Sequence, residues 1–236
     1  MNGLIALVGS GEYLPIMDVV DRHLLESLNL NGRKPRVVCL PTAAGQEGDG
    51  SVNRWSNMGV DHFQKLGAEV NALRIIDRES ADDPHWEPFI ENADLIYFSG
   101  GDPGYLYQTM NGSLAWGAVQ RARERGAVFA GCSAGAMILA QSVPSFRMFG
   151  IADGFGLVPA KFIVPHFDAI PPMFKPLVLV LRKQLKDNQR MVGVDEDTAL
   201  VGTPGGQWKV MGRSKVYVYT STNKQIFRSG ESLTLD

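Results

Sequence analysis

Short apolar runs alternate with segments of helical periodicity along residues 3–140. In the first such segment, Ile16, Val19, Val20 and Leu24 recur roughly every three to four positions, as on the buried face of a helix. The pattern predicts strands at 3–9, 36–43, 68–75, 93–101 and 127–133, and helices at 15–28, 51–67, 85–93 and 114–126. Continuous apolar strands between amphipathic helices predict an α/β fold, a doubly wound and mostly parallel sheet with helices on both faces.

The pattern changes after residue 140. Residues 141–160 are rich in Gly, Pro and Phe and have no clear period, so we expect a long loop, and loops of that length are usually functional. A strand is expected at 161–167 and a helix at 173–188. From about residue 191, short apolar runs separated by Gly, Asn and Ser predict a β meander. No linker or repeat divides the chain, so residues 1–236 are expected to form a single α/β domain with a β-rich C-terminal part.

Charge and composition narrow the classes of function. A formal net charge of -2 over 236 residues, without a basic cluster, argues against nucleic acid and a membrane surface as partners. The first apolar stretch meets Gly9 and Gly11 too early for a signal peptide or a membrane span. Cys39 and Cys132 lie inside apolar runs, which favours buried thiols and a reducing cytoplasm over a disulfide framework. We expect a small-molecule partner; a homodimer stays open.

Candidate cofactor sites are not indicated by the sequence. No His or Cys cluster has the spacing of metal ligands, so neither a metal nor any other cofactor is expected. The glycines of "GSGEY" do not complete the GxGxxG fingerprint of a dinucleotide site.

The stretch "GCSAG" places Ser133 between a predicted strand and a helix-forming run. A nucleophile elbow needs a sharp strand-to-helix turn with small neighbours, and Gly131, Ala134 and Gly135 supply them. The alternative is a tight turn capped by serine. A cap is usually followed three residues later by Glu or Gln, and Ala136 stands there instead. Ser133 is therefore the candidate nucleophile.

A serine nucleophile needs a base, and the chain has four histidines. His23, His62 and His85 fall within or just before predicted helices, whereas His166 closes the predicted strand "KFIVPHF". Ligands bind beyond the carboxyl ends of parallel strands, so elimination favours His166.

The acid that would orient the imidazole is less clearly indicated. Asp153 is the carboxylate between Ser133 and His166 and is the first candidate, with a turn residue in "ADG" as the alternative. If Asp153 is a turn residue, a backbone carbonyl, a water molecule or another carboxylate must orient His166. The other carboxylates that we consider are Glu12, Asp195 and Glu196.

Backbone N–H groups for an oxyanion hole are expected at two places. One is Ala134, directly after the nucleophile, and the other is Gly101 or Asp102 in "SGGDPGY", where glycines let the main chain approach a substrate. Glu12 and Tyr105 follow strand ends too, and with Tyr13 they are expected to line the same crevice and contact substrate.

The ordered set "YFSGGDPGYL", "GCSAGA", "GLVPAKFIVPHF" and "VGVDEDTALV" resembles peptidase family S51, over roughly residues 3–201. The resemblance implies a class I glutamine amidotransferase-like α/β fold and a Ser-His pair completed by Asp or Glu. It implies that Ser133 is the nucleophile, His166 the base, and Gly101 with Ala134 the oxyanion donors.

The family contains dipeptidase E and cyanophycinase, and this sequence departs from both at positions that bear on specificity. Pro103 follows "GGD", and Val164 and Pro165 precede "HF", so neither known specificity carries over. We expect a serine hydrolase that cleaves a peptide or isopeptide bond in a short substrate, Asp-containing substrates among the candidates, through an acyl-enzyme. A catalytically silent binding protein with the same fold is the alternative, and an esterase a lesser one.

Overall fold

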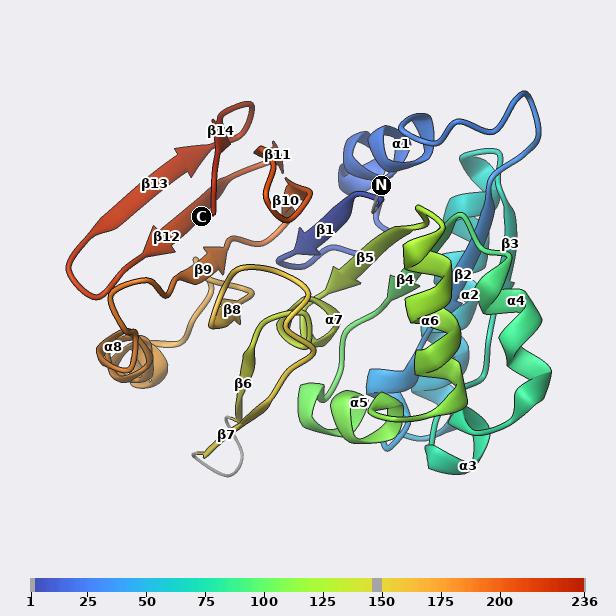
Figure 1. Cartoon of the computed structure of the whole chain (residues 1–236), viewed down its shortest axis with the longest axis horizontal. Helices are drawn as coiled ribbons and strands as arrows, with labels where there is room; N and C mark the ends of the chain where they lie inside the picture. Colours follow the sequence, from blue (N-terminus) through green and yellow to red (C-terminus); the bar gives the residue numbers. More distant parts are fainter. Residues whose placement is uncertain (1–2, 146–149, 236) are drawn as a thin grey trace.

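The computed structural model describes residues 3–145 and 150–235. Its largest sheet has eight strands in the order β14-β11-β10-β1-β5-β4-β2-β3 (Figure 1). The five strands from β1 to β3 in this order are parallel, and β10, β11 and β14 continue the sheet antiparallel. The strands are β1 (Ile5–Val8), β2 (Arg36–Leu40), β3 (Glu69–Ala72), β4 (Leu95–Phe98), β5 (Val128–Cys132), β10 (Thr198–Gly202), β11 (Trp208–Gly212) and β14 (Ser232–Leu233).

Helices cover both faces of this sheet because its strands are apolar on both sides. In β1, Ile5 and Leu7 join the core on one face, while Ala6 and Val8 join the core on the other. The first face packs against α4 (Glu87–Glu91), α5 (Pro103–Met110), α6 (Leu114–Glu124) and α7 (Ala134–Met137), and the second against α1 (Asp18–Glu26) and α2 (Asp49–Lys65). The predicted doubly wound α/β class is thereby confirmed.

Shorter helical turns connect these elements. The strand-end turns η1 (Pro15–Met17) and η2 (Thr42–Ala44) follow β1 and β2, and α3 (Arg78–Ala81) and η3 (Pro84–Trp86) lie between β3 and α4. Asp77 caps α3 and Ser113 caps α6, each accepting a hydrogen bond from a backbone N–H of the first turn.

A second sheet of four strands has the order β13-β12-β9-β8, in which β8 (Phe162–Val164) and β9 (Met191–Val194) are parallel. Antiparallel β12 (Lys215–Tyr219) and β13 (Lys224–Arg228) complete it, and η4 (Pro172–Phe174) and α8 (Lys175–Lys183) lie between β8 and β9. The C-terminal strands predicted from about residue 191 are present. They divide between the two sheets, since β10, β11 and β14 belong to the large one (Figure 1).

The segment expected to be a loop at 141–160 contains two paired strands, so that prediction was wrong for residues 142–145 and 150–153. The strands β6 (Ser142–Ser145) and β7 (Gly150–Asp153) pair antiparallel, with Ser142 opposite Asp153. The residues of β7 are exposed. Because an exposed strand needs no apolar residues at alternate positions, the sequence of this segment shows no periodicity that would predict a strand.

Candidate functional site

Ser133 occupies a sharp turn between β5 and α7, with φ of 50° and ψ of -111°. Its N–H donates to Val8 O at 3.0 Å, which ties the turn to the neighbouring strand β1. The two flanking glycines are needed for packing: a Cβ on Gly131 would meet the carbonyl oxygen of Gly135 at 2.2 Å, and one on Gly135 would meet Phe98 O at 2.4 Å. A strained backbone conformation of this kind is common at functional sites. Here Ser133 is partly exposed, while the residues on either side of it in the turn are buried.

His166 lies two residues beyond the end of β8 and also has a positive φ, 51°. Its Nε2 is 3.0 Å from Ser133 Oγ. The structure therefore brings together the two residues that the sequence proposed as nucleophile and base, at hydrogen-bonding distance.

Glu196 completes this arrangement, with Oε1 2.8 Å from His166 Nδ1. The contact follows from strand pairing, because β8 and β9 are parallel and Val164 lies opposite Gly193. His166 and Glu196 each follow the end of one of these neighbouring strands. The N–H of Glu196 donates to Asp168 Oδ1 at 2.8 Å, which fixes the backbone of this segment against the one that carries His166.

Asp153 does not lie at His166, so the expectation that it orients the imidazole is wrong. Asp153 is an exposed residue at the end of β7, paired with Ser142, and its charge acts on the Tyr107 hydroxyl, whose pKa is raised mainly by burial and further by this carboxylate. Glu196, named among the alternatives, takes the place at Nδ1. The signal was present in the sequence: "VGVDED" is an apolar strand that ends in carboxylates.

The two acids beside Glu196 face other partners. Asp195 is buried and accepts a hydrogen bond from Ser214 Oγ at 2.7 Å, and burial raises its pKa. Asp197 pairs with Arg213 at 3.3 Å. The three acids lie in the turn between β9 and β10, and of the three it is Glu196 that reaches the imidazole.

The loop after β4 passes close to Ser133, and its glycines leave room for that approach. A Cβ on Gly100 would lie 3.3 Å from Ser133 Cβ, and one on Gly101, where φ is 141°, would meet Ala43 O at 2.4 Å. The N–H groups on either side of Gly101 are engaged, since Gly100 N donates to Glu12 Oε1 at 2.9 Å and Asp102 N donates to Ala43 O at 2.8 Å. Among the described residues, no protein acceptor takes the N–H of Gly101.

Ala134 is the second expected oxyanion donor, and no acceptor within residues 3–145 or 150–235 takes its N–H either. Asp102, offered by the sequence as an alternative to Gly101, has its amide bonded to Ala43 and its side chain capping α5, where Oδ1 accepts from Tyr105 N at 2.9 Å. The available donors are therefore Gly101 and Ala134, from two different loops.

Three residues expected to line the crevice have other contacts. Glu12 is buried, with its carboxylate oxygens bonded to Gly100 N and to Cys132 Sγ, 2.9 Å each. Tyr105 donates its hydroxyl to Ile76 O at 2.6 Å, and Tyr13 is packed in the core on the α1 and α2 face. The structure thus places Tyr13 in the core and Glu12 beneath the site, where it faces protein donors, while the half-buried Tyr105 is tied to the Ile76 carbonyl.

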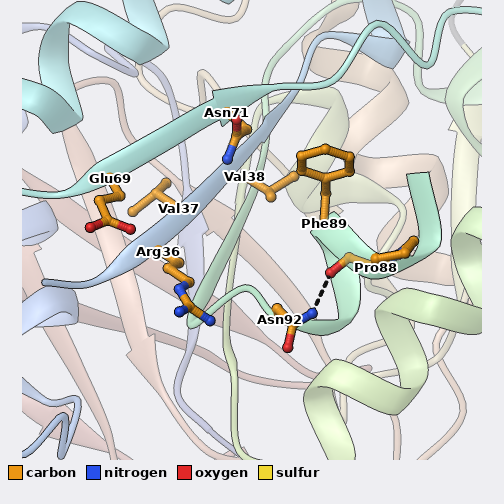
Figure 2. Close-up of a pocket in the computed structure, with 8 residues that line it drawn as sticks. All are labelled: Arg36, Val37, Val38, Glu69, Asn71, Pro88, Phe89 and Asn92. Carbon is orange, nitrogen blue, oxygen red and sulfur yellow. Dashed lines mark hydrogen bonds between the residues drawn. The ribbon is translucent and has the colours of Figure 1, made fainter. Parts of the chain in front are cut away.

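A shallow hollow of about 390 Å³ lies at the other end of the parallel strands. Figure 2 shows the residues that line it, with Arg36 and Glu69 from the starts of β2 and β3 on one side and Phe89 and Asn92 of the α4 segment on the other. Asn92 Nδ2 donates to Pro88 O at 2.8 Å. Ser133 follows the carboxyl end of its strand, so this hollow does not belong to the same site.

Within the described parts of the chain, no group of three or more His, Cys, Asp or Glu side chains could hold a metal ion. No helix in those parts has both the length and the apolar character that crossing a membrane requires.

Comparison with known proteins identifies the family. The family model described as Peptidase family S51 matches residues 5–207. Among relatives, cyanophycinase from Nostoc sp. (strain PCC 7120 / SAG 25.82 / UTEX 2576) is 26% identical over 189 residues, 73% of this chain and 62% of that protein. Cyanophycinase from Synechococcus elongatus is 25% identical over 169 residues, 67% and 52% of the two chains. The chain therefore spans 62% or less of the length of these two relatives.

Solved structures agree with this result. A peptidase from an acI-B1 Actinobacterium has a TM-score of 0.89 and 37% identity, covering 99% of this chain and 97% of that one. A putative Peptidase E protein from Listeria monocytogenes EGD-e has a TM-score of 0.61 and 18% identity, over 97% and 99% of the two chains, and shows the same fold. The resemblance predicted from the ordered motifs is confirmed.

Proposed function

The chain belongs to peptidase family S51, and from that premise we propose that it is a serine-type peptidase acting through an acyl-enzyme. The observation that carries the proposal is the line of contacts from Ser133 Oγ to His166 Nε2, 3.0 Å, and from His166 Nδ1 to Glu196 Oε1, 2.8 Å. A nucleophile, a base and an orienting carboxylate in this order are the parts that amide hydrolysis by a serine nucleophile uses.

In the first half of the reaction, Ser133 Oγ attacks the carbonyl carbon of the substrate and His166 Nε2 takes the hydroxyl proton. Glu196 accepts a hydrogen bond from Nδ1–H, which keeps Nε2 unprotonated toward Ser133 and stabilises the imidazolium that forms. His166 then gives its proton to the leaving amine as the carbon–nitrogen bond breaks. In the second half, a water molecule that is activated by His166 attacks the acyl-enzyme, and the carboxylic acid product leaves as Ser133 recovers its proton.

The carbonyl oxygen becomes negatively charged in the tetrahedral intermediate, and we assign as its donors the N–H groups of Gly101 and Ala134, which have no acceptor among the described residues. A donor of this kind contributes about 10²–10³-fold to turnover in serine proteases. Gly101 has no side chain to obstruct the approach, and a Cβ there would collide with Ala43.

Peptide and isopeptide bonds present the same electrophilic carbon, so the proposal covers both. An acidic substrate has less support, because the side chains near His166 include the carboxylates of Glu196 and Asp168. These carboxylates would repel an acidic side chain of the substrate. A substrate panel should therefore contain dipeptides and isopeptides with acidic, neutral and basic side chains at the cleaved bond.

The experiment combines this panel with a fluorophosphonate probe, on wild type and on Ser133→Ala. We expect covalent labelling of wild type at Ser133, cleavage of at least one panel member, and loss of both in the variant. Ser142→Ala is the matched control, since Ser142 lies in the β6–β7 hairpin. Labelling that survives Ser133→Ala, or a wild type that neither labels nor cleaves, contradicts the proposal.

The alternative of a silent binding protein rested on a weak acid at Asp153. Glu196 in contact with His166 removes that reason, so the binding protein is retained only as the outcome of a negative labelling experiment.

A further inference from the structure

Glu12 is a buried carboxylate that the proposed reaction does not use. It is 6% exposed, its Oε1 accepts from Gly100 N and its Oε2 from Cys132 Sγ, both at 2.9 Å. Burying a carboxylate is costly unless both oxygens find donors, so this arrangement is specific to the place.

The three contacting residues come from three adjacent strand ends. Glu12 follows β1, Cys132 ends β5 and Gly100 follows β4, and the sheet order is β1-β5-β4. The Glu12 side chain therefore spans the end of β5, directly before the nucleophile, and reaches the loop on its far side. A Cβ on Gly100 would lie 3.0 Å from Glu12 Oε1 and 3.3 Å from Ser133 Cβ, which shows how closely carboxylate, loop and serine approach.

Among the described residues, the amide of Gly101 is the one in the loop after β4 that has no protein acceptor. Ser99 N donates to Leu40 O at 3.2 Å, Gly100 N to Glu12, and Asp102 N to Ala43 O. Gly100 and Gly101 have no side chains that would restrict rotation of the peptide between them. The Glu12 bond fixes the peptide immediately before the one that carries the Gly101 N–H.

We propose that Glu12 is a positioning residue: by fixing the Ser99–Gly100 peptide it sets the orientation of the next peptide, so that the Gly101 N–H points at the developing oxyanion. This inference rests on the proposed function, since it assigns a role within that same site. Glu12 acts through the loop and touches no reacting atom. Its required property is an acceptor oxygen at Gly100 N, and its negative charge is not required.

Cys132 anchors the other carboxylate oxygen. Burial, and then the charge of Glu12, raise the pKa of the Cys132 thiol well above its ordinary value. The group therefore remains S–H at neutral pH and can donate to Oε2. This contact keeps the carboxylate in the one orientation in which Oε1 faces the loop.

The test compares Glu12→Ala and Glu12→Gln by the rate of fluorophosphonate labelling and by kcat and KM on a substrate from the panel. Glu12→Ala leaves Gly100 N without its acceptor, and we expect labelling and kcat to fall about 10²-fold with KM within about threefold, since a small misplacement of a catalytic group costs that much. Glu12→Gln keeps an amide oxygen for Gly100 N and turns its NH₂ toward the sulfur, so we expect both rates within about threefold of wild type. Asp21→Asn, at a buried carboxylate between α1 and α2, is the control and should leave kcat within about twofold.

Each contrary result overturns the proposal. Glu12→Ala that labels and turns over within threefold of wild type shows that the loop does not need the carboxylate. Glu12→Gln as slow as Glu12→Ala shows that the charge, and not the acceptor, is needed. A similar loss in Asp21→Asn shows a general structural effect. A wild type that does not label removes the proposed function and this inference with it, whereas a labelled wild type with an equally fast Glu12→Ala removes the inference alone.

Glu12→Asp serves where Glu12→Ala does not fold, as judged by circular dichroism. It keeps the charge but is one methylene shorter and cannot reach Gly100 N and Cys132 together. We expect kcat to fall at least about tenfold. Turnover within threefold of wild type in this folded variant overturns the proposal.

Discussion

Two histidine–carboxylate pairs in this molecule have the same distance and different surroundings. His166 Nδ1 lies 2.8 Å from Glu196 Oε1, and His62 Nε2 lies 2.8 Å from Asp21 Oδ2. The side chains of the first pair are 42% and 38% exposed, and those of the second 6% and 1%.

The second ring nitrogen distinguishes the pairs. In His166 it faces a serine hydroxyl at 3.0 Å, whereas in His62 it faces Asp18 Oδ1 at 3.8 Å. The buried pair packs against Tyr13 and Phe63, and burial raises the pKa of Asp21 despite its hydrogen bond to His62. One pair is a candidate base with its orienting carboxylate, and the other joins α1 to α2.

The comparison teaches that a short His–carboxylate distance is no evidence of catalysis by itself. The informative differences are the strand-end position, the positive φ of His166 and Ser133, and a nucleophile on the outer nitrogen. Each of these features can be tested by matched substitutions in the two pairs.

The largest expected effect is on turnover. His166→Gln removes the base and should lower kcat by at least about 10⁴-fold, because the serine is then no longer activated. His62→Gln in the buried pair should leave kcat within about twofold. Steady-state kinetics on the same panel substrate checks both, and a comparable loss in His62→Gln would erase the functional distinction between the pairs.

The second effect concerns the carboxylate partner. Glu196→Gln should lower kcat about 10³-fold, since a neutral amide no longer stabilises the imidazolium and can present its NH₂ to Nδ1, which favours the wrong tautomer. Asp153→Asn is the matched control on the exposed β7 strand and should keep kcat within about twofold. A larger loss in Asp153→Asn than in Glu196→Gln would restore Asp153 as the orienting acid.

The free energy of unfolding should fall more when the buried pair is substituted than when the exposed pair is. His62→Ala leaves the buried Asp21 without its hydrogen-bond donor and should lower the free energy of unfolding by about 2 kcal/mol. His166→Ala should change it by less than about 1 kcal/mol, because ion pairs with exposed members contribute little. Urea denaturation of both variants measures the difference, and equal losses would show that exposure does not separate the pairs.

The smallest expected effect is a decline in stability at alkaline pH. Burial raises the pKa of Tyr13 and Tyr97 near His62, and raises that of Cys39 to about 12. The folded state then holds protons that the unfolded state loses, so stability is complete below the unfolded pKa, about 8.5 for cysteine, and falls as pH rises toward the folded value.

Cys39→Ala sharpens this measurement. The free energy of unfolding of wild type should decline by about 1 kcal/mol more than that of Cys39→Ala between about pH 8 and pH 9.5. Urea denaturation at the two pH values checks it. Parallel declines in the two proteins would contradict a buried, protonated thiol.

Much of the fold and two of the three members of the candidate triad can be inferred from local sequence. Strands and helices appear as changes of apolar period, and Ser133 is identified by the small residues that a strained strand-to-helix turn demands. His166 is the histidine at a strand end. These inferences succeed because sterics and periodicity act between residues close in the chain.

The orienting acid and the role of Glu12 depend on strand order instead. Asp153 is nearer to Ser133 and His166 in sequence, but Glu196 meets the imidazole because β8 and β9 pair in parallel. Glu12 reaches Gly100 because β1, β5 and β4 are neighbours in the sheet. Which strands are neighbours in a sheet depends on hydrogen bonds between their backbones, and every residue type offers nearly the same backbone groups. Contacts between distant segments are therefore difficult to predict from the amino-acid sequence.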